Sequence, residues 1–217
     1  SSLLKAGIRV DYLILLERGL NNYENYRDTL TSHPSPETIL VCSTTCAPKL
    51  HTLFEKSIVY YRPALMPTTL FSPSIDHVLH YEGPQTTNAG LAWVVSLGYE
   101  NIVIAGVDLG TANQDAPRSK GALGISPRDF DVEVKGNKRD LVFSNRVLID
   151  AKRVKEICIR NSQNTNFFNL SDGAYIEGAK PIDYKDYRLI ARHKRKNISE
   201  ENVCLYKSFP NADITSA

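Results

Sequence analysis

The sequence predicts an α/β protein with a mostly parallel sheet, and three observations lead to this prediction. Short apolar runs alternate with amphipathic or polar stretches along the first half of the chain, as in repeated βα units. The apolar runs are continuous, which favours strands that are buried on both faces. The chain has 217 residues, of which 42% are hydrophobic and 23% charged, and this is ordinary usage for one large globular domain.

The first half contains the clearest βα alternation. The expected strands are Tyr12–Leu16, Thr38–Cys42 and Ser57–Tyr61, and the helix-like segments between them are Asn22–Leu30 and Pro48–Glu55. Prolines at positions 34 and 36 punctuate the connection between the first helix and the second strand. This order predicts three strands whose connections each contain a helix.

The stretch from Val78 to Gly110 is the most informative part of the chain. A break at Gly83 and Pro84 precedes a largely apolar helix that Thr86 or Thr87 can cap and that ends near residue 98. A buried strand, NIVIA, follows at residues 101–105. An apolar helix followed directly by an apolar strand predicts the centre of the core.

The rest of the chain predicts a loop, a helix and a strand. Residues 111–124 are rich in Gly, Pro, Ser and Asn, which favours a long surface loop. Apolar positions at helical spacing predict an amphipathic helix over Asn145–Ile159. A short strand at Asn166–Leu170 and a polar turn at Ser171–Gly173 complete the expected elements. We expect one domain over residues 1–187 and a basic C-terminal segment over 188–217, whose run RLIARHKRK fits a solvated helix face or tail.

Composition and charge exclude several functional classes. The net charge of +2 gives no global field for nucleic acid or an anionic membrane. No run approaches the roughly 18 apolar residues of a membrane span, and the start of the chain lacks a secretion-signal pattern, so we expect a cytoplasmic protein. The four cysteines are too scattered for a disulfide framework or a zinc site, although Cys42 and Cys46 lie close in sequence. We therefore expect buried thiols and no resident metal.

Candidate ligand-binding residues follow the apolar strands. In open α/β sheets, ligands bind outside the carboxyl ends of the strands. Four places qualify: Glu17 after YLILL, the turn Gly83–Asn88, Asp108 after NIVIAGV, and the turn Asn169–Gly173. We expect these four places to share one edge of the sheet. Each of the two acids could bind a ribose hydroxyl, a metal ion or a reacting proton, or could be an ordinary solvated strand-end residue.

The turn GPQTTN predicts a phosphate site. It comprises Gly83, Pro84, Gln85, Thr86, Thr87 and Asn88. Free backbone N–H groups and short hydroxyl side chains at a helix N-terminus favour an anion through the helix dipole and hydrogen bonds together. The alternative is a capped helix whose threonine satisfies its own N–H groups. The turn is neither a Walker P-loop nor a GxGxxG fingerprint.

Four segments, taken in their order along the chain, resemble one known family. They are AGIRVDYLILLER, GPQTTNAGLAWVVSLGYENIVIAGVDLG, VKGNKRDLVFSNRVLIDAKRVKEICI and NLSDGAYIEGAKPI. Together they resemble the family that joins motility-associated-factor (Maf) flagellin glycosyltransferases to the archaeal 6-hydroxymethylpterin pyrophosphokinase MptE. The likeness extends from the start of the chain to about Pro181.

The resemblance implies a Rossmann-like three-layer sandwich similar to the catalytic domains of bacterial sialyltransferases. In the Maf branch it implies transfer of a nonulosonic acid from a CMP-activated donor to flagellin hydroxyl groups. In the MptE branch it implies transfer of diphosphate from ATP to a pterin alcohol, with Mg²⁺. The ligand-side positions of the family match Glu17, Gly83, Pro84, Thr86, Asp108, Asn169 and Gly173.

The chain also departs from the family pattern at two places. The family usually begins with a strand and a GPSL-like glycine turn that helps to hold the nucleotide. This chain starts after that point, so we expect either a fragment of a longer protein or a chain that lacks that part of the site. Family members commonly carry histidine in the loop after the Gly-x-Asp-Leu motif, where this chain has Arg118 and Lys120. These two cations could neutralise a phosphate leaving group.

The leading hypothesis is a glycosyltransferase-like enzyme that uses a nucleotide-activated sugar. Its expected catalytic residues are Asp108, Glu17, Lys120 and Arg118. Its expected nucleotide-binding or phosphate-binding residues are Gly83, Pro84, Gln85, Thr86, Thr87, Asn88, Asn169, Ser171 and Gly173. The alternatives are an MptE-like pyrophosphokinase, which would use Mg²⁺ with Asp108 as a ligand, and a non-catalytic nucleotide-binding or scaffold domain. The expected partners are a CMP-linked sugar or a nucleoside triphosphate, with a protein acceptor such as flagellin.

Overall fold

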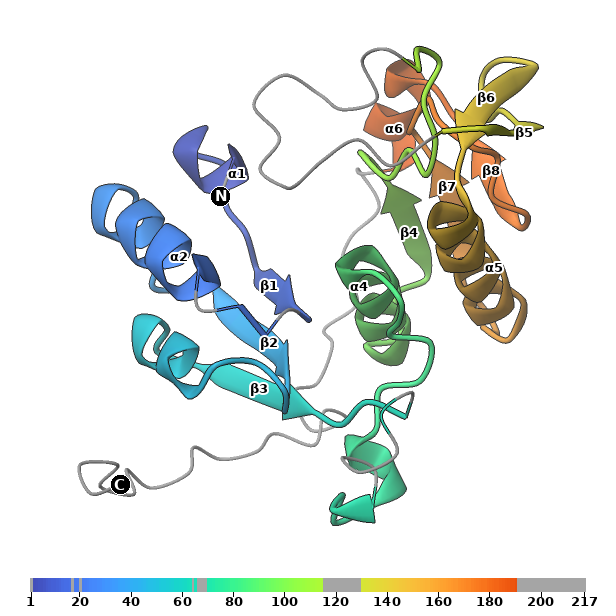
Figure 1. Cartoon of the computed structure of the whole chain (residues 1–217). Helices are drawn as coiled ribbons and strands as arrows, with labels where there is room; N and C mark the ends of the chain where they lie inside the picture. Colours follow the sequence, from blue (N-terminus) through green and yellow to red (C-terminus); the bar gives the residue numbers. More distant parts are fainter. Residues whose placement is uncertain are drawn as a thin grey trace. The chain divides into compact units, whose positions relative to one another are not determined.

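The computed structural model describes residues 2–16, 18–19, 21–63, 65, 70–114 and 130–190. The chain divides into two compact units (Figure 1): unit 1 contains the described residues up to His80, and unit 2 contains those from Tyr81 onward. Each unit has its own three-stranded sheet. The units are therefore described separately. The expected domain limits of 1–187 and 188–217 stay predictions.

Unit 1 is built around the first three predicted strands. They are β1 (Tyr12–Leu15), β2 (Ile39–Ser43) and β3 (Ser57–Tyr60), with helix α2 (Asn21–Ser32) and 3₁₀ helix η1 (Pro48–Leu53) between them. The strands pair in the order β1-β2-β3, and both pairs are parallel. The βα alternation predicted from the sequence is thus confirmed, except that the second connection forms a 3₁₀ helix.

The core of unit 1 forms between its sheet and the two helices. Its buried members are Leu15, Leu40, Cys42, Cys46 and Leu50. The side chains of Tyr23 and Tyr26 on α2 pack against this cluster. Both cysteines are free and buried, as is Cys158 in unit 2, so the prediction of buried thiols is confirmed for these three. Burying such side chains is the main favourable term in forming the unit.

Unit 2 contains a second parallel sheet. Its strands are β4 (Asn101–Ile104), β7 (Asn166–Asn169) and β8 (Ala179–Pro181), paired in the order β4-β7-β8. The apolar helix is α4 (Thr86–Ser96) and the amphipathic helix is α5 (Arg146–Arg160). The two helices pack against each other. Each helix directly precedes a strand of this sheet, so α4-β4 and α5-β7 are successive α/β units.

The start of each helix in unit 2 is set by local chemistry. Asn145 precedes α5, and its side-chain Oδ1 accepts a hydrogen bond from Leu148 N at 3.1 Å. Helix α4 is preceded by Gln85, whose side chain makes no capping bond. The prediction that Thr86 or Thr87 caps α4 is therefore wrong, because both residues already belong to the first turn.

Several short elements were not predicted from the sequence. They are α1 (Ser2–Lys5), η2 (Ile75–His77), the antiparallel pair β5 (Val132–Lys135) and β6 (Leu141–Ser144), β8, and α6 (Tyr184–Ile190). Most residues of β5 are exposed, so it lacks the continuous apolar run of a buried strand. β5 and β6 form by pairing with each other, and β8 forms by pairing with β7.

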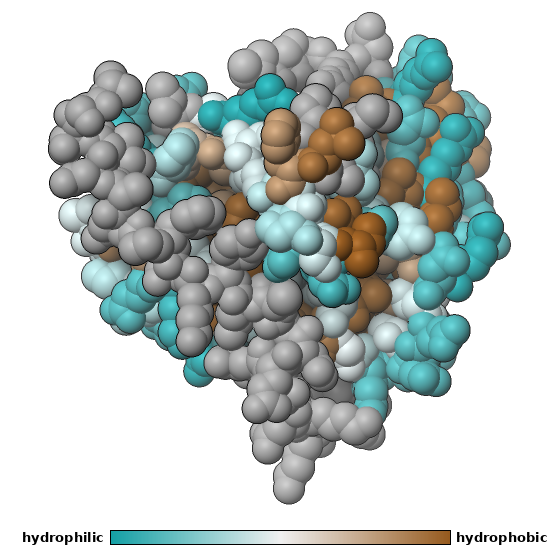
Figure 2. Space-filling model, turned by 90° about the horizontal axis from the view of Figure 1, so that it is seen from below, coloured by the Kyte–Doolittle hydropathy of each residue, from teal (hydrophilic) through white to brown (hydrophobic). Residues whose placement is uncertain are grey.

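Some large apolar side chains stay at the surface of unit 1. Leu70, Phe71 and Ile75, just before and within η2, are 77%, 78% and 66% exposed. Figure 2 shows hydrophobic residues in brown beside charged residues in teal on the face it presents. These three side chains add little to the core of unit 1.

Both units thus combine parallel strands with helices, and the chain has the predicted α/β, Rossmann-like fold. Some expectations lie outside the described residues. They are most of the loop at 111–124, the basic run beyond residue 190, and Cys204.

Candidate functional site

Asp108 lies just beyond the carboxyl end of β4, and its side chain is exposed. The backbone around it is fixed by two hydrogen bonds. Val107 N donates to Ser171 Oγ at 2.9 Å, and Ala174 N donates to Asp108 O at 2.6 Å. The exposed carboxylate of Asp108 therefore belongs to a backbone segment that hydrogen bonds fix at Val107 and at Asp108 itself.

Gly173 makes this arrangement possible. A Cβ atom added at this position would lie 1.8 Å from Asp108 O and 2.3 Å from its carbonyl carbon. Real Cβ atoms essentially never approach backbone atoms that closely, so only glycine fits here. The predicted Asp108 and the predicted turn 169–173 are therefore in direct contact, as expected for two strand ends on one edge.

The segment 169–173, called the β7 exit, comprises the last residue of β7 and the four residues that follow it. Asn169 is fully buried, and its Oδ1 accepts a hydrogen bond from Ser171 N at 3.0 Å. The hydroxyl of Ser171 is occupied by Val107 N. In this structure both side chains shape the edge of the sheet, and the exposed member of the turn is Asp172.

The hairpin turn between β5 and β6 (residues 136–140) completes this edge, and the sequence reasoning missed it. Asn137 Nδ2 donates to Ser171 O at 2.7 Å and to Asn169 O at 3.2 Å, and Asn137 N donates to Gly173 O at 2.8 Å. A signal was present, because Gly-Asn between VEVK and LVFS is a typical turn dipeptide between two strands.

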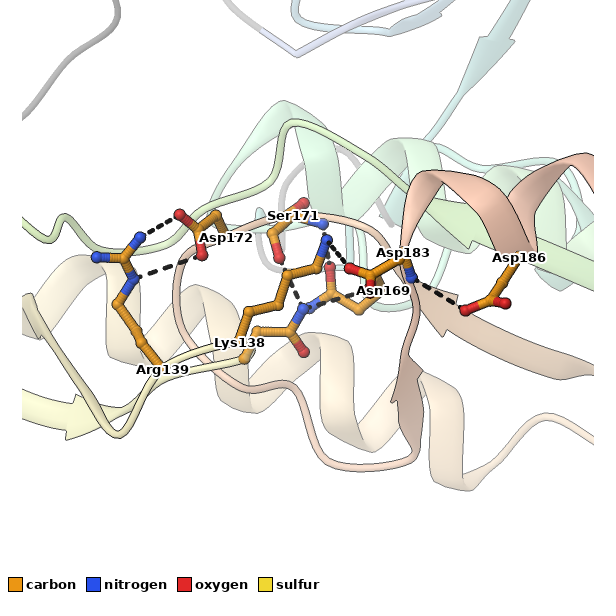
Figure 3. A network of polar contacts seen from close by, with 8 residues as sticks. Lys138, Arg139, Asn169, Ser171, Asp172, Asp183 and Asp186 are labelled. Carbon is orange, nitrogen blue, oxygen red and sulfur yellow. Dashed lines mark hydrogen bonds and ion pairs between the residues drawn. The ribbon is translucent and has the colours of Figure 1, made fainter.

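Two ion pairs flank the hairpin turn. Arg139 pairs with Asp172 of the β7 exit through two N–H groups, and Lys138 Nζ lies 3.4 Å from Asp183. Figure 3 shows both cations reaching from the hairpin turn toward the opposing carboxylates. Asp183 and Asp172 are more than half exposed, so each pair contributes no more than about 1 kcal/mol.

The first turn of α4 contains the predicted phosphate-binding residues. A short connection joins α4 to β4. In α/β units such a helix runs antiparallel to the strand that follows it, so we expect this first turn on the side of the carboxyl end of β4. The peptide bond between Gly83 and Pro84 is cis. Gln85 and Thr86 are partly exposed and Thr87 is exposed. The first backbone N–H groups of the helix remain candidates for an anion.

Asn88 differs from its neighbours in this turn because it is buried between two helices. Its Nδ2 donates to Ala151 O at 2.9 Å, and its Oδ1 accepts a hydrogen bond from Lys155 Nζ at 2.5 Å. The Asn88 side chain therefore ties α4 to α5. The phosphate-binding role predicted for Asn88 remains a prediction, and its amide would have to leave this pairing to fulfil it.

Lys155 is a second polar residue in the same helix interface. Only 1% of its surface is exposed, and burial lowers the pKa of its amine to about 7. The pKa of the nearby Cys158 thiol is raised to about 11, chiefly by burial. The amine donates to the neutral amide oxygen of Asn88, so charge on Lys155 is poorly compensated.

Three predicted catalytic residues cannot be placed. Glu17, Arg118 and Lys120 lie outside the described residues. Among the residues that the structure describes, no group of three or more His, Cys, Asp or Glu side chains could hold a metal ion. Within the same residues, no helix has the length and apolar character needed to cross a membrane.

A comparison with solved structures finds a similar fold. The structure of a Maf glycosyltransferase from Magnetospirillum magneticum AMB-1 matches 93% of this chain at 30% identity, with a TM-score of 0.72. The chain spans 30% of the length of that protein. None of the curated proteins searched matches the chain.

A family model matches residues 1–114, which include all of unit 1, the first turn of α4 and Asp108. The hairpin turn and the β7 exit lie beyond the matched residues. The model is described as 6-hydroxymethylpterin diphosphokinase MptE-like. Because it matches more than half of the 217 residues, the chain belongs to the MptE-like family.

Proposed function

We propose that this protein is a glycosyltransferase-like enzyme that transfers a nonulosonic, sialic-acid-like sugar from a CMP-activated donor to a hydroxyl group of a protein or glycan. The observation that carries the proposal is the edge formed by Asp108 and Gly173, where an exposed carboxylate is fixed beyond β4. The likeness to a Maf glycosyltransferase supports the same chemistry. Flagellin is the proposed acceptor and the cytoplasm the proposed compartment.

The roles proposed for the described residues of unit 2 follow from their positions in the chain and in the fold. The backbone N–H groups of Gln85, Thr86 and Thr87 at the start of α4 bind the phosphate of the donor. Asp108 accepts a hydrogen bond from the ribose or from the acceptor hydroxyl. The sequence alone supports the roles proposed for Glu17, in holding the ribose or the acceptor, and for Arg118 or Lys120, in steadying the leaving phosphate. Rate enhancement then comes from positioning and electrostatics.

The second candidate is a diphosphokinase that transfers diphosphate from ATP to a pterin alcohol. The family model that matches residues 1–114 favours it. This chemistry needs Mg²⁺, which commonly binds one or two carboxylates together with substrate phosphates. Asp108 is exposed and fits such a ligand. A third candidate is a nucleotide-binding domain without catalysis.

A thermal-shift titration with CMP, CTP, ATP and GTP, each with and without Mg²⁺, separates these candidates. Binding to the native state raises the melting temperature by mass action. A rise with CMP or CTP that does not need the metal supports the glycosyltransferase. A rise with ATP only in the presence of Mg²⁺ supports the diphosphokinase. Absence of any shift contradicts a nucleotide site.

Substitution of Asp108 separates an enzyme from a binding domain. Asp108→Asn removes the charge and keeps the shape, and it should lower turnover at least about 100-fold, as the loss of a positioned catalytic carboxylate does. Asp150→Asn is the matched control, because Asp150 is exposed on α5 and pairs with Arg153 at 3.5 Å. Unchanged turnover in Asp108→Asn would refute the catalytic role.

A further inference from the structure

Two buried amides at the edge of unit 2 each have one polar atom without a hydrogen-bond partner. The atoms are Oδ1 of Asn137 and Nδ2 of Asn169. Asn137 is 8% exposed and Asn169 is 0% exposed. Asn137 Oδ1 is an acceptor and Asn169 Nδ2 is a donor. The two residues are in contact, because Asn137 Nδ2 donates to the backbone oxygen of Asn169.

Rotating either amide by 180° does not satisfy these atoms. Asn137 Nδ2 faces two carbonyl oxygens, those of Asn169 and Ser171, so an oxygen in its place would be repelled. Asn169 Oδ1 accepts from Ser171 N, so a nitrogen there would face another donor. The bonds already made fix both orientations. The acceptor Asn137 Oδ1 and the donor Asn169 Nδ2 are therefore both buried without a hydrogen-bond partner.

Such atoms are rarely left alone in folded proteins. The large majority of buried side-chain polar atoms have a partner, and an exception calls for an ordered water, an ion or a role in binding. A partner for this pair must accept from Asn169 Nδ2 and donate to Asn137 Oδ1. The requirement is for adjacent acceptor and donor groups.

The groups that enclose this pair are held by weak interactions. The ion pair between Lys138 and Asp183 brackets Asn169, because Lys138 follows Asn137 and Asp183 follows Ile182, whose N–H also binds Asn169 O at 3.1 Å. The Arg139–Asp172 pair lies on the other side of the hairpin turn (Figure 3). Because exposed ion pairs are weak, separating them would cost a ligand little free energy.

We propose that Asn137 and Asn169 recognise the base of the nucleotide through a ring nitrogen and the exocyclic amine beside it. The ring nitrogen accepts from Asn169 Nδ2, and the amine donates to Asn137 Oδ1. Cytosine and adenine share this edge, so the inference rests on the proposed function and holds for a CMP-linked donor and for ATP alike. Asn137 lies in a segment to which no role was assigned from the sequence.

The first test uses the unaltered protein and calorimetric titration. The ligands are CMP, AMP, and their analogues without the exocyclic amine, the pyrimidin-2-one and purine ribonucleotides. Loss of the amine should weaken binding of the preferred nucleotide about tenfold, the effect of one hydrogen bond to a buried acceptor. The stronger ligand of CMP and AMP identifies the base. An analogue that binds within about twofold of its parent overturns the proposal.

The second test reverses the donor. Asn169→Asp keeps an oxygen that accepts from Ser171 N but replaces the free donor with an acceptor. It should weaken CMP or AMP at least about tenfold and raise the relative affinity for GMP, whose N1–H and amine offer two donors. Asn166→Asp is the matched control at the opposite end of β7, where the exposed side chain binds Asn101.

The outcomes separate this proposal from the proposed function. If CMP or AMP binds but Asn169→Asp and Asn166→Asp give the same affinities, base reading by the amides is wrong and the nucleotide site stands. If no nucleotide binds the unaltered protein, both proposals fail. Should Asn169→Asp not fold, as judged by its melting curve, the analogue series on the unaltered protein decides.

Discussion

The two units have similar parallel sheets but bury different kinds of side chain. Among the described residues, the buried polar or charged side chains of unit 1 are Thr29, Thr38 and Ser43. Those of unit 2 are Glu82, Asn88, Asn137, Ser144, Asn145, Lys155, Asn169 and Ser171. Buried polar groups cost stability unless they are fully bonded. Unit 2 therefore has more buried polar side chains that need hydrogen-bond partners than unit 1 has.

The strand ends show the same contrast. In unit 1 the carbonyl oxygen of Leu15, at the end of β1, accepts from Tyr60 OH at 3.4 Å and Cys46 Sγ at 3.7 Å. The pKa of the Cys42 thiol is raised by its hydrogen bond with Cys46 and by burial, so this thiol stays neutral. In unit 2 the corresponding edge presents amides and carboxylates. At the end of β2, by contrast, the hydroxyl groups of Ser43 and Thr45 bond with each other at 2.9 Å, so the two sheets differ in the groups at their carboxyl ends.

The largest expected effect is that of Gly173→Ala, which breaks the polar edge. The added Cβ would overlap Asp108 O at 1.8 Å, and we expect a loss of about 3 kcal/mol or more in the free energy of unfolding. Urea denaturation measures it. The control is Gly19→Ala, where an added Cβ meets nothing within 4 Å. Equal stability of the two variants would show that the two strand ends are not in contact.

A smaller loss is expected when polarity is introduced into unit 1. Cys42→Ser places a stronger hydrogen-bonding group in the core beside Cys46 and His51, whose Nε2 lies 3.8 Å from Cys42 Sγ. We expect a loss of about 1–3 kcal/mol in the free energy of unfolding, because the hydroxyl is desolvated without a good partner. A change below about 0.5 kcal/mol in the free energy of unfolding would contradict the apolar character of the core around Cys42.

The pH dependence of stability tests the buried charge in unit 2. The folded pKa of Lys155 is lowered to about 7 from 10.5, so between these values the unfolded chain holds a proton that the folded chain has released. Stability should therefore rise with pH above 7, by at most about 1.4 kcal/mol per pH unit. Lys155→Met should remove this slope.

The range from pH 7 to 8.5 is the useful window for this measurement. Burial lowers the pKa of His51 from 6.5, so its contribution is complete below the window. The pKa of the Cys158 thiol is raised from 9.0, so its opposite contribution begins above it. Chemical denaturation at several pH values, with the unaltered protein and Lys155→Met side by side, gives the slope. Equal slopes would mean that Lys155 stays charged in the folded state.

The smallest effect should come from the surface of the polar edge. Arg139→Gln removes the pair with Asp172 and should cost no more than about 1 kcal/mol, less at high salt. Arg153→Gln on α5 is the control, since its pair with Asp150 lies at 3.5 Å and the Arg153 side chain is more exposed than that of Arg139. A loss above about 2 kcal/mol for Arg139→Gln would show that this ion pair is a structural part of the edge.

The sequence by itself determined the α/β class, the main strands and helices, and the places where ligand-binding residues should lie. Continuous apolar runs and helical spacing are local signals, and they were sufficient for β1 to β4, α2, α4, α5 and β7. Asp108 and Gly173 could be named because polar residues after buried strands meet at one edge.

Only the tertiary structure decided how those residues are used. It showed that Asn88 bonds with Lys155 across a helix interface, that Ser171 binds Val107, and that Asn137 from an unpredicted hairpin lies against Asn169. These partners are 32 to 67 residues apart in the sequence. No local pattern encodes such pairings, because burial and hydrogen bonding between distant segments are properties of the folded chain.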